Sequence, residues 1–132
     1  ALREMGVRLF LASGTDEEDV RREAELLGYA SYFDGGIWGA VNDIKHEPKK
    51  IVLNNIINSV GRENASRIVT FGDGPVEIRE TAKAGGFTVG VASDEIRRYG
   101  LNETKRRRLI LAGADIVIPD YSQLEQLKQL IF

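Results

Sequence analysis

An apolar run that ends in a glycine-flanked aspartate constrains the fold of this chain more than any other feature. The run Ile68–Phe71 is followed by Gly72-Asp73-Gly74-Pro75-Val76-Glu77, and Pro75 opens a segment with helical character. This order predicts a buried strand, a tight loop and a helix, which is the unit of a parallel α/β sheet. Ligands of such sheets bind at the carboxyl ends of the strands, so Asp73 and Glu77 are predicted to lie at a binding edge.

Strand-like and helix-like segments alternate along the chain, with no internal repeat and no long linker. The predicted strands are Val7–Ala12, Gly36–Val41, Arg67–Phe71, Phe87–Val91 and Asp115–Ile118. The predicted helices begin at a capping box in Thr15-Asp16-Glu17-Glu18, near Pro48, at Pro75, at Thr104 and at a second capping box formed by Ser122 and Glu125. This alternation predicts an α/β fold with a parallel sheet and helical crossovers.

Apolar side chains recur at helical spacing in two of the predicted helices. The first stripe is Val20, Ala24 and Leu27, and the second is Leu53, Ile56, Ile57 and Val60. A glycine follows each stripe, as is common where a helix ends. We expect both stripes to face the core.

The composition excludes several classes of function. The length of 132 residues fits one domain, and 42% of the residues are apolar, which suffices for one core. A net charge of −2 gives no electrostatic case for nucleic acid as a partner. The chain has no cysteine and a single histidine, His46, so neither a disulfide nor a histidine-rich zinc site is expected. No apolar run approaches the length of a membrane span, and a cytoplasmic protein is expected.

Ser13 and Gly14 form a candidate phosphate-binding site. They follow the first predicted strand and precede a helix, where backbone N–H groups and the helix dipole favour an anion. The alternative is that Ser13 only caps the helix.

Lys49 is a second candidate for phosphate binding, because a lysine in the first turn of a helix opposes the dipole unless it contacts an anion. Lys45 and Lys50 are close by, spacing does not choose among the three, and each of them could simply be a solvated charge.

Asp73 and Glu77 form a candidate site for a hard cation. A helix that starts at Pro75 puts Glu77 in its first turn, beside the loop that carries Asp73. Two carboxylates in this position are typical ligands of Mg²⁺, directly or through water. The alternative is a tight turn in which Glu77 only complements the helix dipole.

Taken in order, these segments resemble the haloacid dehalogenase superfamily of phosphohydrolases over nearly the whole chain. The motifs that carry the resemblance are Leu9–Gly14 for the second, Lys49 for the third and Gly72–Glu77 for the fourth. The interval from Leu26–Tyr29 to Tyr32–Gly35 resembles the link to the third strand, Ala84–Val91 the segment after the acidic motif, and Ala112–Ile118 the last strand. The resemblance implies a Rossmann-like, three-layer fold with helices on both faces of a parallel sheet.

The resemblance also implies roles for individual residues. Ser13 would hydrogen-bond the transferring phosphoryl group, and Lys49 would neutralise charge on the phosphoryl oxygens. Asp73 would hold Mg²⁺ with the help of Glu77. In the superfamily an aspartate on the first strand attacks phosphorus to form an aspartyl-phosphate, which water then hydrolyses, and a second aspartate two positions on acts as general acid and base.

This chain departs from the superfamily pattern in two ways. Glu77 stands where aspartate is more usual, and no Asp-x-Asp occurs anywhere in the sequence. We therefore expect residues 1–132 to be one partial core domain without its central, nucleophile-bearing strand. That strand would lie between Val7–Ala12 and Arg67–Phe71, so a missing N-terminal segment or a swapped neighbour is expected to complete the sheet.

The expected function is that of a Mg²⁺-dependent phosphomonoesterase acting on a small phosphorylated metabolite, with a phosphomutase as the alternative enzyme, and with this chain alone inactive. Two other classes stay open. The chain could be a non-catalytic regulatory module that keeps a phosphate and Mg²⁺ pocket. It could also be an assembly subunit whose glycine- and aromatic-rich stretch Tyr29–Trp38 docks a partner.

Overall fold

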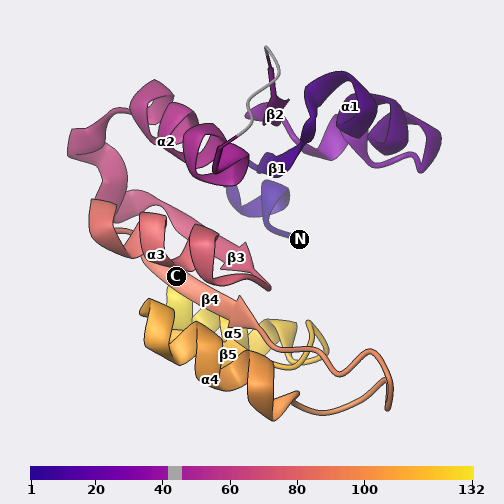
Figure 1. Ribbon diagram of the computed structural model, residues 1–132, viewed down its shortest axis with the longest axis vertical. Helices are drawn as coiled ribbons and strands as arrows, with labels where there is room; N and C mark the ends of the chain where they lie inside the picture. Colours follow the sequence, from indigo (N-terminus) through magenta and orange to yellow (C-terminus); the bar gives the residue numbers. More distant parts are fainter. Residues whose placement is uncertain (42–45) are drawn as a thin grey trace. The chain divides into compact units, whose positions relative to one another are not determined.

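The computed structural model describes residues 1–41 and 46–132, and Figure 1 shows the helices and strands in chain order. The chain divides into two compact units, Ala1–Gly61 and Arg62–Phe132, which we call unit 1 and unit 2. Each unit is described by itself. The expectation that residues 1–132 form one domain stays a prediction.

Unit 1 is built around two parallel strands. Its elements are η1 (Arg3–Met5), β1 (Phe10–Asp16), α1 (Glu17–Leu26), η2 (Ala30–Tyr32), β2 (Gly36–Ala40) and α2 (Pro48–Val60), where η denotes a 3-10 helix. Leu11 of β1 lies opposite Ile37 of β2. Val20 and Ala24 of α1 pack with Ile37 in a buried cluster. The inward side of α2 is also buried, and it consists of Val52, Leu53, Ile56 and Ile57.

Unit 2 is built around three parallel strands in the order β3-β4-β5. Its elements are η3 (Arg62–Arg67), β3 (Val69–Gly72), α3 (Pro75–Ala84), β4 (Phe87–Val91), α4 (Glu103–Ala112), β5 (Ile116–Ile118) and α5 (Leu124–Ile131). Ile78 of α3, Ala92 after β4 and Leu109 of α4 form its buried cluster. Gly72, Gly90 and Val117 are in register across the three strands, so the loops that follow these strands leave the same edge of the sheet.

The predicted α/β fold, with parallel strands and helices on both sides of the sheets, is confirmed. Phe87–Val91 forms a strand with the predicted bounds, and α3 begins at Pro75 as predicted. No helix within residues 1–41 or 46–132 is long and apolar enough to cross a membrane.

The first strand lies later in the sequence than predicted, at Phe10–Asp16 rather than Val7–Ala12. The backbone N–H of Leu9 donates to Asp34 Oδ1 at 2.9 Å, and the Leu9 carbonyl accepts the Gly35 N–H at 2.8 Å. These bonds tie Leu9 to the turn before β2, and the ladder begins only at Phe10.

Two predicted helix caps are wrong. Asp16, not Thr15, caps α1, because its carboxylate accepts the N–H groups of Glu18 and Asp19. The capping box at Ser122 does not form, since α5 begins at Leu124 without a side-chain cap. The Ser122 N–H donates instead to Asp120 Oδ1 at 2.9 Å, in a turn that precedes the helix.

Two further predictions differ from the structure. Leu27 does not continue the buried stripe of α1, because the helix ends at Leu26 and Leu27 is 64% exposed. The strand predicted at Arg67–Phe71 is Val69–Gly72, because a 3-10 helix extends through Arg67.

Candidate active site

The second half of β1 and the start of α2 bring two of the predicted phosphate-binding residues, Gly14 and Lys49, together in unit 1. Ser13 and Gly14 lie within β1 and not after the strand as predicted, because the strand continues to Asp16. A Cβ added to Gly14 would lie 3.5 Å from both Cβ and backbone N of Lys49, and 3.6 Å from Cγ of Pro48. Gly14 therefore packs directly against the first turn of α2. Ser13, the preceding residue, is half-buried, and its Oγ accepts the Thr15 N–H at 3.2 Å. The Ser13 hydroxyl thus lies next to the backbone that contacts Lys49.

The start of α2 shows different surroundings for two of the three lysines that the sequence left open, Lys49 and Lys50. Pro48 occupies the first turn, and the N-cap residue Glu47 makes no side-chain cap. Lys50 Nζ lies 3.6 Å from Glu47 Oε2 in an ion pair at the helix surface. Lys45 lies outside the described residues. The contact with Gly14 falls on Lys49, and its role toward phosphate stays a prediction.

Asp73 and Glu77 both belong to unit 2, at the turn between β3 and α3. Asp73 follows the last residue of β3 and is exposed. Glu77 is only 5% exposed, and its Oε1 accepts the Gly74 N–H at 2.9 Å. The glutamate thus folds back onto the N-terminus of its own helix.

Glycine at position 72 makes room for the Glu77 side chain. A Cβ on Gly72 would come within 2.7 Å of Glu77 Oε1 and closer still to Cγ. A Cβ on Gly74 would lie 3.1 Å from Glu77 Oε2. The two glycines therefore form a cradle in which the carboxylate lies, at the end of β3 where Asp73 emerges.

The donors at this turn fit Mg²⁺. Carboxylate oxygens are the hard ligands that Mg²⁺ prefers, and the ion is commonly held by one or two carboxylates together with water and phosphate oxygens. Asp73 offers an exposed carboxylate, whereas Glu77 already uses Oε1 to cap the helix. Asp73 is therefore the better candidate for a direct ligand. Within the described part of the chain, no group of three or more His, Cys, Asp or Glu side chains converges as a metal site would.

Tyr121 is a residue of this region that the sequence analysis missed. It lies after β5, and its ring packs against Phe71 of β3 with centroids 5.8 Å apart and ring planes inclined by 52°. Burial raises the pKa of the Tyr121 phenol, and the negative charge of Asp73 raises it further. A search of the residues just beyond each predicted strand would have found it, because strand ends in a parallel sheet share one edge.

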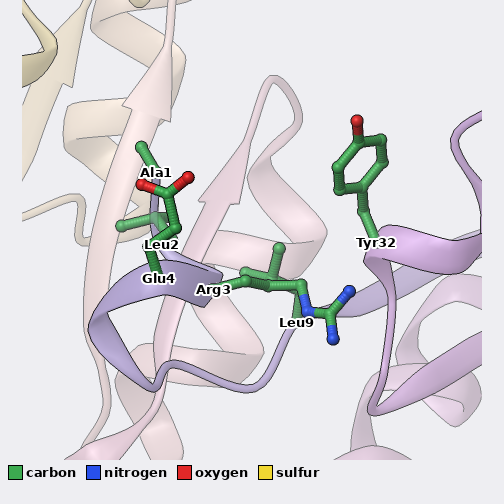
Figure 2. Close-up of a pocket in the computed structure, with 6 residues that line it drawn as sticks. All are labelled: Ala1, Leu2, Arg3, Glu4, Leu9 and Tyr32. Carbon is green, nitrogen blue, oxygen red and sulfur yellow. The ribbon is translucent and has the colours of Figure 1, made fainter.

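A hollow of about 410 Å³ lies in unit 1, before the first residue of β1, and Figure 2 shows the residues that line it. Its lining consists of Ala1, Leu2, Arg3, Glu4, Leu9 and Tyr32. None of the predicted site residues lines it. Because it lies beside the amino end of β1, where parallel sheets do not bind their ligands, we do not assign the phosphate site to it.

Comparison with known families gives one match. A family model described as haloacid dehalogenase-like hydrolase matches residues 1–85. A search of curated proteins found no match.

Several solved structures share the fold. A predicted phosphatase from Clostridium acetobutylicum is 22% identical with a TM-score of 0.76, and the match covers 98% of this chain and 55% of that chain. A conserved haloacid dehalogenase-like protein of Agrobacterium tumefaciens is 20% identical with a TM-score of 0.75, covering 98% and 57%. A predicted phosphoglycolate phosphatase from Haemophilus somnus is 18% identical with a TM-score of 0.70, covering 97% and 52%. The chain thus spans about half the length of each of these proteins.

Proposed function

The chain belongs to the haloacid dehalogenase-like hydrolases, and from this premise we propose that it supplies the phosphate-binding and metal-binding residues of a Mg²⁺-dependent phosphomonoester hydrolase. The observation that carries the proposal is the packing of Gly14 against Lys49. This contact joins the carboxyl end of a parallel strand to the first turn of a helix, which is where backbone N–H groups and a lysine can surround an anion.

In this proposal the residues of unit 1 hold the phosphoryl group. The Ser13 hydroxyl and the backbone near Gly14 bind phosphoryl oxygens, and the Lys49 ammonium offsets their charge. Phosphoryl transfer depends mainly on positioning and on electrostatic stabilisation of the oxygens, so these are the contributions that such residues make.

The residues of unit 2 hold the metal in this proposal. Asp73 is the direct ligand, and Glu77 contributes from its glycine cradle, by water or by release of its Oε1 from the Gly74 N–H. Mg²⁺ bound there would supply positive charge to the reaction. A carboxylate at this turn also needs a cation nearby, because carboxylates and a phosphate repel one another.

The nucleophile completes the proposal and comes from outside these residues. An Asp-x-Asp strand, carried by another segment or by a neighbouring copy, would provide the attacking carboxylate, and the chain by itself would be inactive. Support comes from the strands: within the described residues β1 pairs only with β2, and β3 only with β4.

The proposed substrate class is a small phosphorylated metabolite. Phosphoglycolate is the first substrate to assay, because the name of one structural neighbour contains it. A cytoplasmic location is part of the proposal.

A second candidate is a non-catalytic module that binds phosphate and Mg²⁺. The observation that favours it is the absence of Asp-x-Asp from the 132 residues. The two candidates share a binding site and differ only in the nucleophile. Phosphatase activity of the intact gene product, lost on replacement of an Asp-x-Asp aspartate by asparagine, decides for the enzyme.

The proposed function is tested by measuring how Mg²⁺ and inorganic phosphate affect each other's binding, using isothermal titration calorimetry on the intact gene product. If the proposed function is right, Mg²⁺ raises the affinity for phosphate, and phosphate raises the affinity for Mg²⁺ by the same factor. We expect that factor to be about 5–150, the usual range of such couplings. Independent binding would contradict the proposal.

Single substitutions test the phosphate-binding and metal-binding residues separately. Ser13→Ala and Lys49→Ala should each weaken phosphate binding, whereas Lys50→Ala, the neighbouring lysine paired with Glu47, should not. Asp73→Asn should weaken Mg²⁺ binding, whereas Glu95→Gln, which removes a 79% exposed carboxylate, should not. Wild-type binding in Lys49→Ala and Asp73→Asn would refute the assignment of these residues.

A further inference from the structure

The ladder between β1 and β2 is interrupted where the proposed phosphate-binding residues of β1 lie. It pairs Ala12 with Trp38 and resumes only at Asp16, which pairs with Ala40. Three residues of β1, Ser13–Thr15, therefore lie opposite a single residue of β2, and we call these three residues the β1 bulge. Bulges are rare between parallel strands, and they are over-represented next to active sites, where they re-aim a side chain.

The single residue opposite the β1 bulge is Gly39. A Cβ at this position would lie 2.8 Å from the Thr15 carbonyl oxygen, 2.8 Å from the Glu17 backbone nitrogen and 2.5 Å from Glu17 Cα. All three atoms belong to the backbone, so no side-chain rotation would relieve the overlap. The backbone of Gly39 does not have a positive φ. Glycine is therefore required here by the close approach of the chain that leaves the bulge, and not by its own conformation.

A displacement of Thr15 would reach the Ser13 hydroxyl directly. Within the β1 bulge the Thr15 N–H donates to Ser13 Oγ at 3.2 Å. Gly14 lies between these two residues and packs against the first turn of α2, where an added Cβ would lie 3.5 Å from the Cβ of Lys49. The position of Thr15 therefore determines where the Ser13 hydroxyl and the Gly14 backbone lie relative to Lys49.

Polar contacts of α1 hold Glu17 against β2. Its Oε1 accepts the Gly39 N–H at 3.3 Å, and its Oε2 lies 3.6 Å from Arg21 Nη2 in an ion pair within α1. The same Arg21 nitrogen donates to the Ile37 carbonyl at 3.1 Å. The start of α1 is thus fastened to the backbone of β2 at two residues, and this keeps the chain that leaves the bulge close to Gly39.

We propose that Gly39 is a positioning residue for phosphate binding: because it has no side chain, Thr15 approaches β2 closely, and this approach places the Ser13 hydroxyl and the Gly14 backbone for the phosphoryl group. The inference rests on the proposed function, because it assumes that Ser13 and Gly14 bind phosphate. Gly39 acts through Thr15 and does not itself contact the phosphate. A displaced bulge would lose about one hydrogen bond to the anion, and a hydrogen bond to a charged group corresponds to about 10–100-fold in affinity.

The test compares Gly39→Ala with wild type by titrating the intact gene product with inorganic phosphate and, separately, with Mg²⁺, both followed by calorimetry. We expect phosphate affinity to fall by about 10–100-fold. Mg²⁺ affinity in the absence of phosphate should not change, because Asp73 and Glu77 belong to unit 2. The Thr15 amide should exchange faster with solvent, since its hydrogen bond within the bulge is disturbed. Ile37→Val is the matched control, because it weakens the buried cluster behind the same strand and should leave phosphate affinity unchanged.

A second pair of variants tests the inference without an added Cβ. Glu17→Ala removes the acceptor of the Gly39 N–H, whereas Glu18→Ala removes the same charge from an exposed side chain of the same helical turn. We expect phosphate to bind Glu17→Ala about 2–10-fold more weakly than Glu18→Ala, which is the range for one hydrogen bond between uncharged groups. This pair decides the question if Gly39→Ala does not fold, and equal phosphate affinities would then overturn the inference.

Ser13→Ala separates the inference from the proposed function. If Ser13→Ala and Gly39→Ala both weaken phosphate binding and Ile37→Val does not, the inference is supported. If Ser13→Ala weakens phosphate binding but Gly39→Ala binds phosphate like wild type, or loses Mg²⁺ affinity to the same extent, or Ile37→Val loses as much, Gly39 has no positioning role and the proposed function stands. If Ser13→Ala leaves phosphate affinity unchanged, the phosphate assignment fails and the inference fails with it.

Discussion

Replacing Gly72 by alanine tests whether the Glu77 cradle is as tight as the structure indicates. The backbone of Gly72 does not have the positive φ that would exclude alanine. The added Cβ would come within 2.7 Å of Glu77 Oε1, however, and closer still to Cγ. The glutamate would have to leave its place, and its hydrogen bond from the Gly74 N–H would break.

The expected loss of stability follows from three contributions. Overpacking of a filled space costs about 1–3 kcal/mol. Loss of a hydrogen bond to a charged group costs about 1.5–3 kcal/mol. Alanine also restricts the unfolded chain, which offsets about 0.4–1 kcal/mol. We therefore expect Gly72→Ala to lower the free energy of unfolding by about 2–5 kcal/mol.

A double-mutant cycle isolates the contact with Glu77. In a Glu77→Ala background the space beside Gly72 is vacant, so alanine at position 72 should be neutral or slightly stabilising. The measurements are urea unfolding followed by far-UV circular dichroism and hydrogen exchange of the α3 amides, which reports local stability. Gly14→Ala is the control for the same substitution, because its Cβ would meet its neighbours at 3.5 Å or more.

Two results would refute this reasoning. Gly72→Ala with wild-type stability would mean that Glu77 moves aside without cost. An equal loss in the wild-type and Glu77→Ala backgrounds would mean that something other than Glu77 requires glycine at position 72. Gly14→Ala should change the free energy of unfolding by less than about 1 kcal/mol in either case.

The remaining predictions concern a helix cap, a buried hydroxyl and a surface turn. Asp16→Ala should lower the free energy of unfolding by about 1 kcal/mol, because Asp16 caps α1, whereas Thr15→Ala should lower it by less than about 0.5 kcal/mol. Equal losses for the two variants in urea unfolding would contradict the observed cap. The hydroxyl of fully buried Thr88 is hydrogen-bonded to the residues just before β5, so Thr88→Val should cost about 1–3 kcal/mol, with Thr88→Ser as the control. The pKa of Asp94 is lowered by hydrogen bonds from the Arg97 backbone and side chain. At pH values above the ordinary pKa of aspartate, the ionised Asp94 therefore contributes its full stabilisation to this turn. That stabilisation is lost as the pH falls through the lower pKa of the folded state. Amide exchange at Arg97, measured as a function of pH, reports the change.

The elements that the sequence predicted best have strong local signals at both ends. Helix α3 starts at Pro75 and stops before Gly85, which adopts a left-handed conformation. Helix α2 likewise starts at Pro48 and stops before Gly61. Proline fixes the φ of a first turn, and glycine accepts the backbone angles of a helix end, so neither boundary depends on tertiary contacts.

The predictions that were wrong depended on contacts between segments distant in the sequence, or on a choice between neighbouring polar residues. The start of β1 is set by Asp34, which is 25 residues away from Leu9. Asp16 and Thr15 are both good caps, and only the backbone path selects one of them. Tyr121 contacts Phe71 across a central strand. A single sequence contains no periodicity that would pair these two residues.

The burial of the strands gives a separate argument for the proposed additional strand. Strand β4 has a neighbour on each side, and its three middle residues are buried. Every residue of β3 is only half-buried, although the run Ile68–Phe71 has the apolar character of an interior strand. Exposed edge strands usually carry charges or other features that prevent pairing, and β3, with the sequence Val-Thr-Phe-Gly, carries none. An interior-type sequence on a strand that has one neighbour within residues 1–41 and 46–132 is what the proposal requires, since a strand added along β3 would give it the burial that β4 already has.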